Sequence, residues 1–461
     1  MTDLLSQSFL ADSRIKEALA LIEEAYGEHS ARLLSSKEAS SSLKAAYQKL
    51  LDDCSQSRGG QLYYPYLGSG IGKGSLVELL DGSVKYDFIT GIGVHYLGHS
   101  NPALMKHLMA AALSDTVMQG NLQQNNNSSV LMRQFLGLAS GSRLEHCFLS
   151  TSGAQANENA LKMAFQKKAP ARRVLAFEHC FAGRTLALAH ITDKALYRDG
   201  LPDTLKVDYL PFFNAEHPEK SVKRTLHKLE TLLERYPGQY AVMSFELIQG
   251  EGGYYPGDEK FFKEIIKLLN KHDIAVWIDE VQTFGRCSRA FAYQYFNLDD
   301  LVDIVTVGKM SQVCATLFSP VFKARPGLIS QTFTSSSSAI EAAKYTLSLL
   351  SDGGLCGETG KIVQFEKIFH SKLKALAKKY SGHFIGPYGM GGMLAFTIFD
   401  GDLAKTKEFC NRLFDNGVMC FLAGRKPMRV RMLPAMAIVS EAEVDAVFEI
   451  VDQSFLELLE V

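Results

Sequence analysis

The sequence predicts an α/β protein whose main sheet is mostly parallel and is covered by helices on both faces. Between residues 145 and 325, short apolar runs alternate with longer segments of helical periodicity. The runs are apolar nearly throughout, which is the pattern of parallel strands buried on both faces. The chain of 461 residues also exceeds the length at which one hydrophobic core keeps growing, so a second, smaller domain is expected. The predicted strands are HCFLST (146–151), RVLAFE (173–178), YAVMSFELI (240–248), IAVWIDEV (274–281) and VDIVTVG (302–308).

The segments before residue 145 and after residue 325 predict the N-terminal arm, a hairpin and the smaller domain. Residues 1 to about 55 have helical spacing and predict an N-terminal helical arm, and Asp81-Gly82 between two apolar runs predicts a hairpin. The glycine-rich stretch 68–74 lacks the residues of a nucleotide-binding loop and predicts a turn between strands. We expect an N-terminal arm with part of the small domain (1–95), a large domain (96–340) and a C-terminal α+β small domain (341–461).

Composition and charge narrow the possible partners. The chain has 49 basic and 50 acidic residues, so its net charge of −1 creates no general attraction for nucleic acid or an anionic membrane. The eight cysteines include no CxxC pair and the twelve histidines show no metal-binding spacing, so we expect reduced thiols and no metal. No apolar stretch approaches the ~20 residues that span a bilayer. These observations predict a cytoplasmic protein that acts on small molecules.

Three small residues, Ser152, Gly153 and Ala154, lie between a predicted strand and a predicted helix. Unpaired backbone amides at a helix N-terminus bind phosphate through hydrogen bonds and the helix dipole, and small residues let the phosphate approach closely. The same residues would also suit a tight connection from strand to helix. This motif alone leaves both interpretations open.

Two other strands end on charged residues. Asp279 ends the strand IAVWIDEV, and Lys309 follows Gly308 at the end of VDIVTVG. Ligands of open α/β sheets bind at the carboxyl ends of the strands, and a desolvated lysine has the depressed pKa of an amine nucleophile. Taken singly, the aspartate is also compatible with a structural cap or ion pair, and the lysine with an ordinary surface position.

Together, the three features match the three reactive parts of pyridoxal 5'-phosphate. These parts are its phosphate, its ring nitrogen, which a carboxylate keeps protonated, and its aldehyde, which condenses with an amine. The sequence therefore predicts a pyridoxal phosphate enzyme in which Lys309 and Asp279 are the catalytic residues.

Six motifs also occur in order along the chain. They are DGSVKYDFITGIGVHYLGH (81–99), SGAQANENA (152–160), FAGRT (181–185), FELIQGEGG (245–253), DEVQT (279–283) and TF (332–333). Their combination, from about Leu76 to Val451, resembles the class III (ω-amino) aminotransferases, which are pyridoxal phosphate enzymes of fold type I. The resemblance implies a large domain with a mostly parallel sheet and a smaller α+β domain.

The resemblance also implies how the cofactor would be held. The implied set is Ser152, Gly153 and Ala154 (phosphate), Phe181 and Val281 (the two ring faces), Gln282 (phenolic oxygen), Asp279 (ring nitrogen) and Lys309 (Schiff base). Thr332 matches a threonine that binds the phosphate of the neighbouring subunit, so a homodimer is expected.

The implied reaction moves a terminal amino group to a keto acid. Arg431 matches an arginine that binds the acceptor's α-carboxylate. Glu251 matches a glutamate that pairs with this arginine while the donor is bound. Arg184 matches a second carboxylate-binding residue. The segment GKMSQVCA (308–315) resembles the version found in lysine 6-aminotransferases. We therefore expect a donor of the lysine, ornithine or 4-aminobutyrate type and an acceptor such as 2-oxoglutarate.

The sequence departs from the family pattern at several places. Ala182 stands for a usual histidine, Leu247 for a proline, the segment after DEVQT is one residue shorter, and residues 335–338 are all serine. Two alternatives to transamination remain open. One is another reaction on the same cofactor, namely decarboxylation, epimerisation or an aminomutase step, and the other is a cofactor-binding homologue without turnover.

Overall fold

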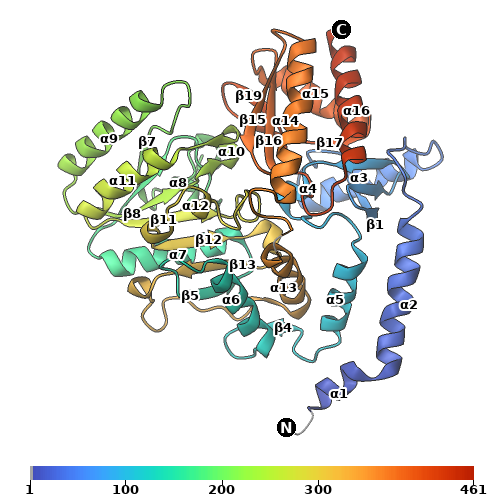
Figure 1. Cartoon of the computed structure of the whole chain (residues 1–461), viewed down its shortest axis with the longest axis horizontal. Coiled ribbons are helices and arrows are strands. Elements are labelled where there is room, and N and C mark those ends of the chain that lie inside the picture. Colours follow the sequence, from blue (N-terminus) through green and yellow to red (C-terminus); the bar gives the residue numbers. More distant parts are fainter. Residues whose placement is uncertain (1–3, 353, 461) are drawn as a thin grey trace.

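The computed structural model describes residues 4–352 and 354–460. Its main feature is a seven-stranded sheet, which lies between layers of helices (Figure 1). The strand order is β5-β13-β12-β11-β8-β6-β7, and every neighbouring pair is parallel except the two that β13 forms. The strands are β5 (His146–Ser150), β6 (Arg173–Phe177), β7 (Lys206–Leu210), β8 (Tyr240–Phe245), β11 (Ala275–Glu280), β12 (Ile304–Val307) and β13 (Cys314–Phe318). The predicted α/β class and mostly parallel sheet are confirmed.

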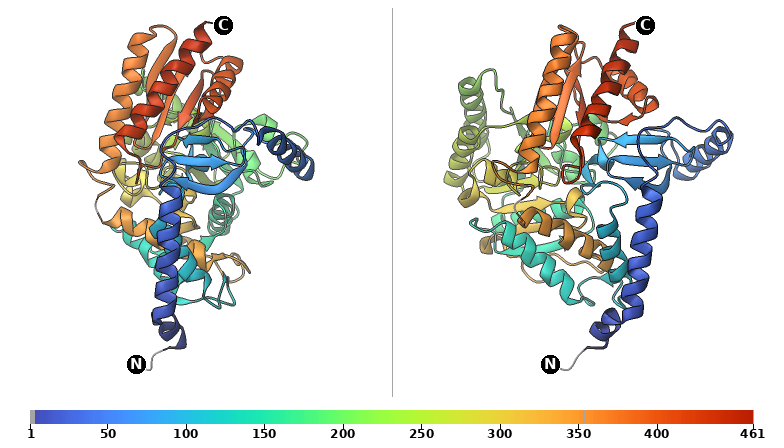
Figure 2. Two further views of the ribbon diagram at one scale, coloured as in Figure 1. Left: turned by 90° about the vertical axis from the view of Figure 1, so that its right-hand side faces the viewer. Right: turned by 45° about the vertical axis from the view of Figure 1, so that its right-hand side comes forward.

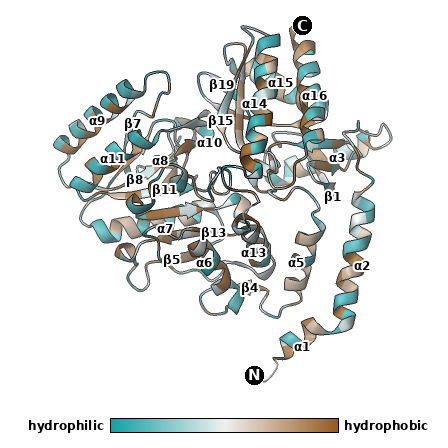
Figure 3. Ribbon diagram, viewed as in Figure 1, coloured by the Kyte–Doolittle hydropathy of each residue, from teal (hydrophilic) through white to brown (hydrophobic). Residues whose placement is uncertain are grey.

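The centre of this sheet is buried on both faces, as the apolar runs predicted. Every residue of β8, β11 and β12 is buried, and Trp277 on β11 donates its indole N–H to Thr306 on β12 (3.1 Å). The helices that cover the sheet place one apolar face against it, and Figure 3 shows their teal, hydrophilic outer sides against brown strands. These helices include α6 (Asn126–Leu138), α7 (Gly153–Lys168), α9 (Pro218–Arg235), α11 (Glu259–Lys271) and α13 (Ser337–Ser351).

All five predicted strands are confirmed, and two further strands were not predicted. β7 is the half-exposed strand at one edge of the sheet. β13 follows directly after the Lys309 turn and runs antiparallel to both of its neighbours. Because β13 returns immediately beside β12, the lysine turn is held between two strands of one sheet.

A second, four-stranded antiparallel sheet lies in the C-terminal part of the chain, with its helices at the top of Figure 1. Its order is β15-β16-β19-β18. Helix α16 begins with a capping box, in which Ser440 and Glu443 exchange hydrogen bonds with each other's backbone. The elements are β15 (Phe384–Met390), β16 (Met393–Ile398), β18 (Phe421–Gly424), β19 (Met428–Met432), α14 (Lys361–Lys379), α15 (Leu403–Asp415) and α16 (Glu441–Leu459).

A third sheet, of order β1-β2-β3-β17, joins distant parts of the chain. The hairpin at Asp81-Gly82 is confirmed, because Gly82 has a φ of 76° and β2 pairs antiparallel with β3. The prediction of a turn at 68–74 is wrong, since residues 68–73 form β1 and only Gly74 lies in the connection to β2. A side chain at Gly72 would collide with His99 and the Leu76 carbonyl, so glycine lets this strand lie close to its neighbours. The strands are β1 (Gly68–Lys73), β2 (Leu76–Leu79), β3 (Val84–Asp87) and β17 (Val418–Met419).

The predicted N-terminal helical arm is confirmed. Its helices are α1 (Leu5–Ala11), α2 (Ser13–Ser30) and α3 (Lys44–Arg58), and Figure 2 shows α2 running along the outside of the molecule. α2 packs on α5 (Pro102–Ala112), where Lys106 pairs with Glu23 (2.8 Å). The division of the chain at residues 95 and 340 stays a prediction. Among the described residues, no helix is both long and apolar enough to cross a membrane.

The remaining α-helices and strands of the described residues are short. They are α4 (Thr90–Gly93), α8 (Leu188–Ile191), α10 (Gly250–Gly253), α12 (Ala292–Tyr295), β4 (Met118–Gln119), β9 (Ile248–Gln249), β10 (Tyr255–Pro256) and β14 (Ser335–Ser336).

Candidate active site

The predicted catalytic residues lie at the carboxyl ends of two adjacent strands. The parallel register of β11 and β12 pairs Asp279 with Thr306, three residues before Lys309. Lys309 starts a tight turn with a left-handed φ of 54°, and the chain then reverses into β13. A side chain at Gly308 would lie 2.8 Å from the Cys314 sulfur, so glycine is needed for the chain to reach this turn.

Burial moves the pKa values of both groups toward neutrality. Burial lowers the pKa of Lys309 to about 8, although the Asp279 carboxylate acts in the opposite direction. Burial raises the pKa of Asp279 to about 6. The Asp279 carboxylate accepts hydrogen bonds from the Val281 amide (2.9 Å) and the Asn157 side chain (2.7 Å), which fix its orientation. A neutral amine is therefore available near neutral pH.

Asn157 belongs to the site, although sequence reasoning missed it. It lies on the buried face of α7 and also donates to the Ala182 carbonyl (2.7 Å). The signal was present, since Asn157 is inside the SGAQANENA motif and follows Gly153 by about one helical turn.

Glu246 is a second missed residue, just beyond the end of β8. Its carboxyl oxygens accept hydrogen bonds from the amides of Phe181 (2.7 Å) and Gly250 (3.0 Å). Burial, together with the nearby Asp279 carboxylate, raises the pKa of Glu246 to about 8. Glu246 therefore joins the predicted ring-stacking position at Phe181 to the turn α10.

The predicted phosphate-binding residues form the N-terminus of α7. Ser152 caps this helix by accepting a hydrogen bond from the Gln155 amide (3.1 Å). A side chain at Gly153 would lie 2.7 Å from Val281, so the start of α7 packs directly against a residue predicted to cover the ring. The first-turn amides of Gly153 and Ala154 have no partner within the helix and are available to an anion.

The residues around Lys309 fit pyridoxal phosphate. The buried side-chain oxygen of Gln282 has no hydrogen-bond partner among the described residues, and this amide is the one predicted to approach the phenolic oxygen. Asp279 supplies the buried carboxylate that the ring nitrogen needs, and the α7 N-terminus supplies the anion site. The structure thus brings all of the predicted cofactor residues except Thr332 to one place.

Thr332 lies on an exposed segment beside β4. The Asn121 amide donates to the Gln331 carbonyl (3.1 Å), and the Thr334 amide donates to the Gln119 carbonyl (2.7 Å). Thr332 and Phe333 are exposed. The predicted contact of Thr332 with the cofactor of a neighbouring subunit stays a prediction.

The structure brings together the predicted acceptor arginine and its glutamate. Arg431 on β19 is fully buried and donates from Nη2 to Glu251 Oε1 on α10 (2.6 Å). Its Nε and Nη1 have no partner among the described residues. Burial acts to raise the pKa of Glu251, but the nearby cations, Arg431 first and then Lys309 and Lys194, together lower it below its ordinary value. Glu251 is therefore a carboxylate, and the arginine can bind a further acceptor.

Arg184, the second predicted carboxylate-binding residue, is exposed. Its guanidinium lies 3.7 Å from the centre of the Tyr197 ring, which in turn meets Phe181 edge-on at 6.4 Å. Arg184 is thus placed beside Phe181 through Tyr197, and it forms no hydrogen bond or ion pair with Glu251 or Arg431 among the described residues.

Comparison with known proteins decides the family. The model of the family "Aminotransferase class-III" matches residues 68–455. The chain belongs to the class III aminotransferases. It is 28% identical to the acetylornithine aminotransferase of Archaeoglobus fulgidus over 82% of this chain and 93% of that protein. It is also 28% identical to the succinylornithine transaminase of Photorhabdus laumondii, over 79% of this chain and 88% of that protein.

A solved structure agrees with this assignment. The aminotransferase resembles the lysine aminotransferase from M. tuberculosis in the internal aldimine form with a TM-score of 0.77 and 25% identity. The match covers 88% of this chain and 99% of that chain. The protein is an aminotransferase that uses pyridoxal phosphate and has the predicted fold, and the two alternatives to transamination are not favoured.

The structure accounts for part of the unusual sequence of the aminotransferase. Three of the four serines fix the start of α13: one caps the helix, one binds the segment before β4, and one binds α5. Ser336 caps the helix by accepting from the Ala339 amide (3.1 Å), Ser337 donates to the Thr116 carbonyl, and Ser338 donates to the Leu108 carbonyl (2.9 Å). In the lysine turn, Gln312 donates to the Val94 carbonyl (2.8 Å), so it packs the loop.

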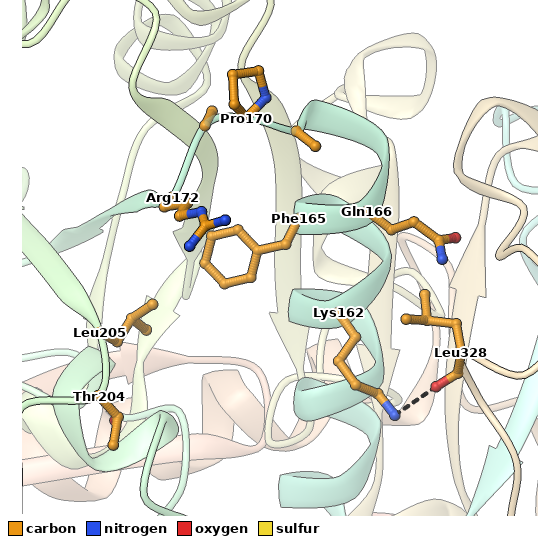
Figure 4. A pocket seen from close by; sticks show the side chains of 10 residues that line it. Lys162, Phe165, Gln166, Pro170, Arg172, Thr204, Leu205 and Leu328 are labelled. Atoms are coloured by element: carbon orange, nitrogen blue, oxygen red, sulfur yellow. Dashed lines mark hydrogen bonds between the residues drawn. The ribbon is translucent and has the colours of Figure 1, made fainter.

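A separate surface hollow of about 510 Å³ lies at the far end of α7 (Figure 4). Phe165 and Lys162 line it, and Lys162 donates to the Leu328 carbonyl (2.9 Å). None of the predicted site residues lines this hollow, so it is distinct from the active site.

Proposed function

We propose that this aminotransferase takes a terminal amino group from a donor of the lysine, ornithine or 4-aminobutyrate type and passes it to a keto acid such as 2-oxoglutarate. The observation that carries the proposal is the contact between Arg431 and Glu251. A terminal-amine donor has no carboxylate beside its reacting carbon, whereas the acceptor has one. The same place must therefore be neutral in one half-reaction and positive in the other.

The Glu251–Arg431 pair meets both requirements. While Glu251 is paired with Arg431, the two charges cancel, and the apolar chain of the donor fits beside them. When the acceptor enters, its α-carboxylate replaces Glu251 and forms a planar, two-pronged contact with the guanidinium. The similar proteins named acetylornithine aminotransferase and lysine aminotransferase support a donor of this class.

The remaining residues have roles that follow from their positions. Bound pyridoxal phosphate supplies an electron sink for the carbon that loses a proton. The Asp279 carboxylate holds a proton on the ring nitrogen, and Asn157 keeps that carboxylate aimed. Lys309, whose pKa burial lowers to about 8, is the residue that would hold the cofactor through its amine. Once the substrate's amino group had taken its place on the cofactor, the freed Lys309 amine would carry the proton to and from the reacting substrate carbon.

Single-turnover measurements on the holoenzyme test this proposal. Lysine, ornithine and 4-aminobutyrate would each be mixed with the enzyme, with alanine as a donor that lacks a terminal amine, and the loss of the cofactor's absorbance band followed. The aminated enzyme would then be mixed with 2-oxoglutarate or pyruvate. We expect fast reaction with a terminal-amine donor and with 2-oxoglutarate. Faster reaction with alanine than with all three terminal amines would refute the donor class.

We also infer a homodimer in the cytoplasm. The exposed positions of Thr332 and Phe333 support the dimer, and the absence of a disulfide among the described cysteines supports a reducing location. Light scattering at assay concentration tests the first inference, and a fully active monomer would refute it. Cell fractionation tests the second.

A further inference from the structure

Strand β19 carries two arginines that both contact the turn α10. Arg429 and Arg431 are two residues apart, so their side chains leave the strand on the same face. Arg431 binds the side chain of Glu251, and Arg429 donates from Nη1 to the Gly253 carbonyl at the end of the turn (2.6 Å). The same short turn is thus held at two points by one strand.

Arg429 is buried without a compensating negative charge. It is 3% exposed, its Nε has no partner, and it forms no ion pair with any residue that the structure describes. Its guanidinium lies between two rings, 3.8 Å from the centre of Tyr255 and 3.6 Å from that of Tyr388. Burying such a cation is costly, and stacking on aromatic rings offsets only part of the cost.

The two rings belong to different parts of the fold. Tyr255 is on β10, next to α10, whereas Tyr388 is on β15 in the C-terminal sheet. Arg429 therefore connects the turn that carries Glu251 to the sheet that carries Arg431.

Glu251 depends on this connection more than Arg431 does. A helix of four residues is not stable by itself, and α10 is held by the Gly250 amide on Glu246 (3.0 Å), by the Tyr254 amide on the Gln249 carbonyl (2.8 Å) and by Arg429. Arg431, in contrast, lies on a strand that is paired on both sides, with β16 and with β18. The pairing of β9 with β10 also holds the base of the turn. Loss of Arg429 would therefore loosen the turn at its Gly253 end while leaving Arg431 in place.

We propose that Arg429 is a positioning residue for the substrate-carboxylate site. By holding the Gly253 carbonyl, it keeps Glu251 against Arg431 and so sets how readily a substrate carboxylate replaces Glu251. This inference rests on the proposed function, in which Glu251 and the acceptor compete for Arg431. It has an unusual consequence: removal of Arg429 strengthens the binding of an acceptor-like dicarboxylate, whereas general damage to the site would weaken it.

The test measures binding of glutarate, a dicarboxylate that lacks the keto group and does not react. Its dissociation constant would be measured by calorimetry on the holoenzyme and on the Glu251→Gln, Arg429→Met and double variants. Replacing Glu251 removes the carboxylate that competes with glutarate for Arg431. Binding should then tighten about 10-fold, because glutarate no longer has to displace a hydrogen bond between two charged groups. Arg429→Met should tighten binding about 3- to 10-fold alone but less than about 2-fold in the Glu251→Gln background, because coupled residues are not additive.

Two controls separate positioning from charge and from folding. Arg425→Met removes the same charge from the exposed connection between β18 and β19 and should not tighten binding. Arg429→Lys keeps a donor for the Gly253 carbonyl but cannot stack as a plane between the rings. It should tighten binding less than Arg429→Met does, and it provides the test if the methionine variant fails to fold.

The outcomes distinguish the inference from the function on which it rests. If Glu251→Gln leaves glutarate binding unchanged, there is no competition for Arg431, and both proposals fall. If Glu251→Gln tightens binding but the Arg429 variants weaken it or leave it unchanged, only the positioning role is refuted. Equal tightening by Arg429→Met with and without Glu251 would also refute it.

Discussion

The carboxyl edge of the seven-stranded sheet and the contact between β19 and α10 both bury charged side chains, but they accommodate the charge differently. At the strand edge, burial shifts the pKa of Asp279 to about 6 and that of Lys309 to about 8, so either group can exchange a proton near neutral pH. Between β19 and α10, Arg431 keeps its charge, because a guanidinium does not lose its proton in a protein, and Glu251 compensates it. The first region is suited to moving protons and the second to exchanging carboxylates.

The largest loss of activity is expected from a substitution at the carboxyl edge of the seven-stranded sheet. Lys309→Ala removes the nucleophile and the proton carrier together, so single turnover with the donor should fall by more than about 10⁴-fold. Stopped-flow absorbance would measure it. Lys372→Ala is the control, since this surface lysine pairs with Asp445 away from the site and its loss should leave turnover unchanged. Turnover at the wild-type rate in Lys309→Ala would show that another group does the chemistry.

Asp279→Asn should impair both half-reactions alike, by about 10²- to 10⁴-fold, the range of acid–base contributions. The amide cannot hold a proton on the ring nitrogen, and both half-reactions use the same ring. The rates of the two halves would be compared in separate single-turnover experiments. A loss confined to one half would mean that the carboxylate acts on a substrate.

Arg431→Ala is expected to affect the two half-reactions differently, whereas substitutions at the strand edge affect both. The half-reaction with 2-oxoglutarate should lose about 2–5 kcal/mol of transition-state stabilisation, the cost of truncating one partner of a buried charge pair. The donor half-reaction should change much less, because the arginine is neutralised at that stage. Equal losses in both halves, measured in the same way, would contradict the carboxylate exchange.

The pKa of Lys309 predicts a pH profile for capture of the cofactor. Only the neutral amine reacts, and burial lowers the pKa to about 8. When cofactor-free protein is mixed with pyridoxal phosphate, the capture rate should level off above pH 8 and be about 100-fold lower at pH 6, ten-fold per pH unit. Because the Asp279 carboxylate favours the charged amine, Asp279→Asn should move the midpoint to lower pH. A midpoint near 10.5, the ordinary value for lysine, would show that the amine is not desolvated.

The smallest effect concerns Ser336, which caps α13. Ser336→Ala should cost about 1 kcal/mol of stability in urea unfolding and leave both half-reactions unchanged. A change in the acceptor rate without a change in stability would place this serine in the substrate site.

The strand-end residues could be predicted from the sequence because their signals are local. Buried parallel strands are apolar almost throughout. A charged residue at the end of such a strand (Asp279) or just after it (Lys309) is therefore easily recognised in the sequence. Edge and glycine-rich strands lack this contrast. β7 is half-exposed, and half of the residues of β1 are glycines, which carry no apolar side chain to mark the strand.

The contact between β19 and α10 could be predicted only in part. Family resemblance identified Arg431 and Glu251, but nothing near Arg429 in the sequence shows that it would be buried between Tyr255 and Tyr388, which are 174 and 41 residues away. Glu246 was overlooked for a related reason. Its pKa is raised first by burial, which only the complete fold creates, and then by the carboxylate of Asp279 on a different strand.

The sheet that joins β3 to β17 has a consequence for how the protein is made. About 330 residues separate the two strands, and at a synthesis rate of about 5–20 residues per second the ribosome needs roughly 15–65 s to supply the second after the first. During this time β3 is paired with β2 but lacks its second partner, β17. Tyr64, which donates to the Cys420 carbonyl (2.9 Å), lacks this acceptor. The seven-stranded sheet is complete in the nascent chain well before β17 is synthesised. Strand β3 and Tyr64 are thus translated early but are among the last to reach all of their native contacts, and a nascent chain stalled before residue 418 would expose one unpaired edge of β3 to chaperones.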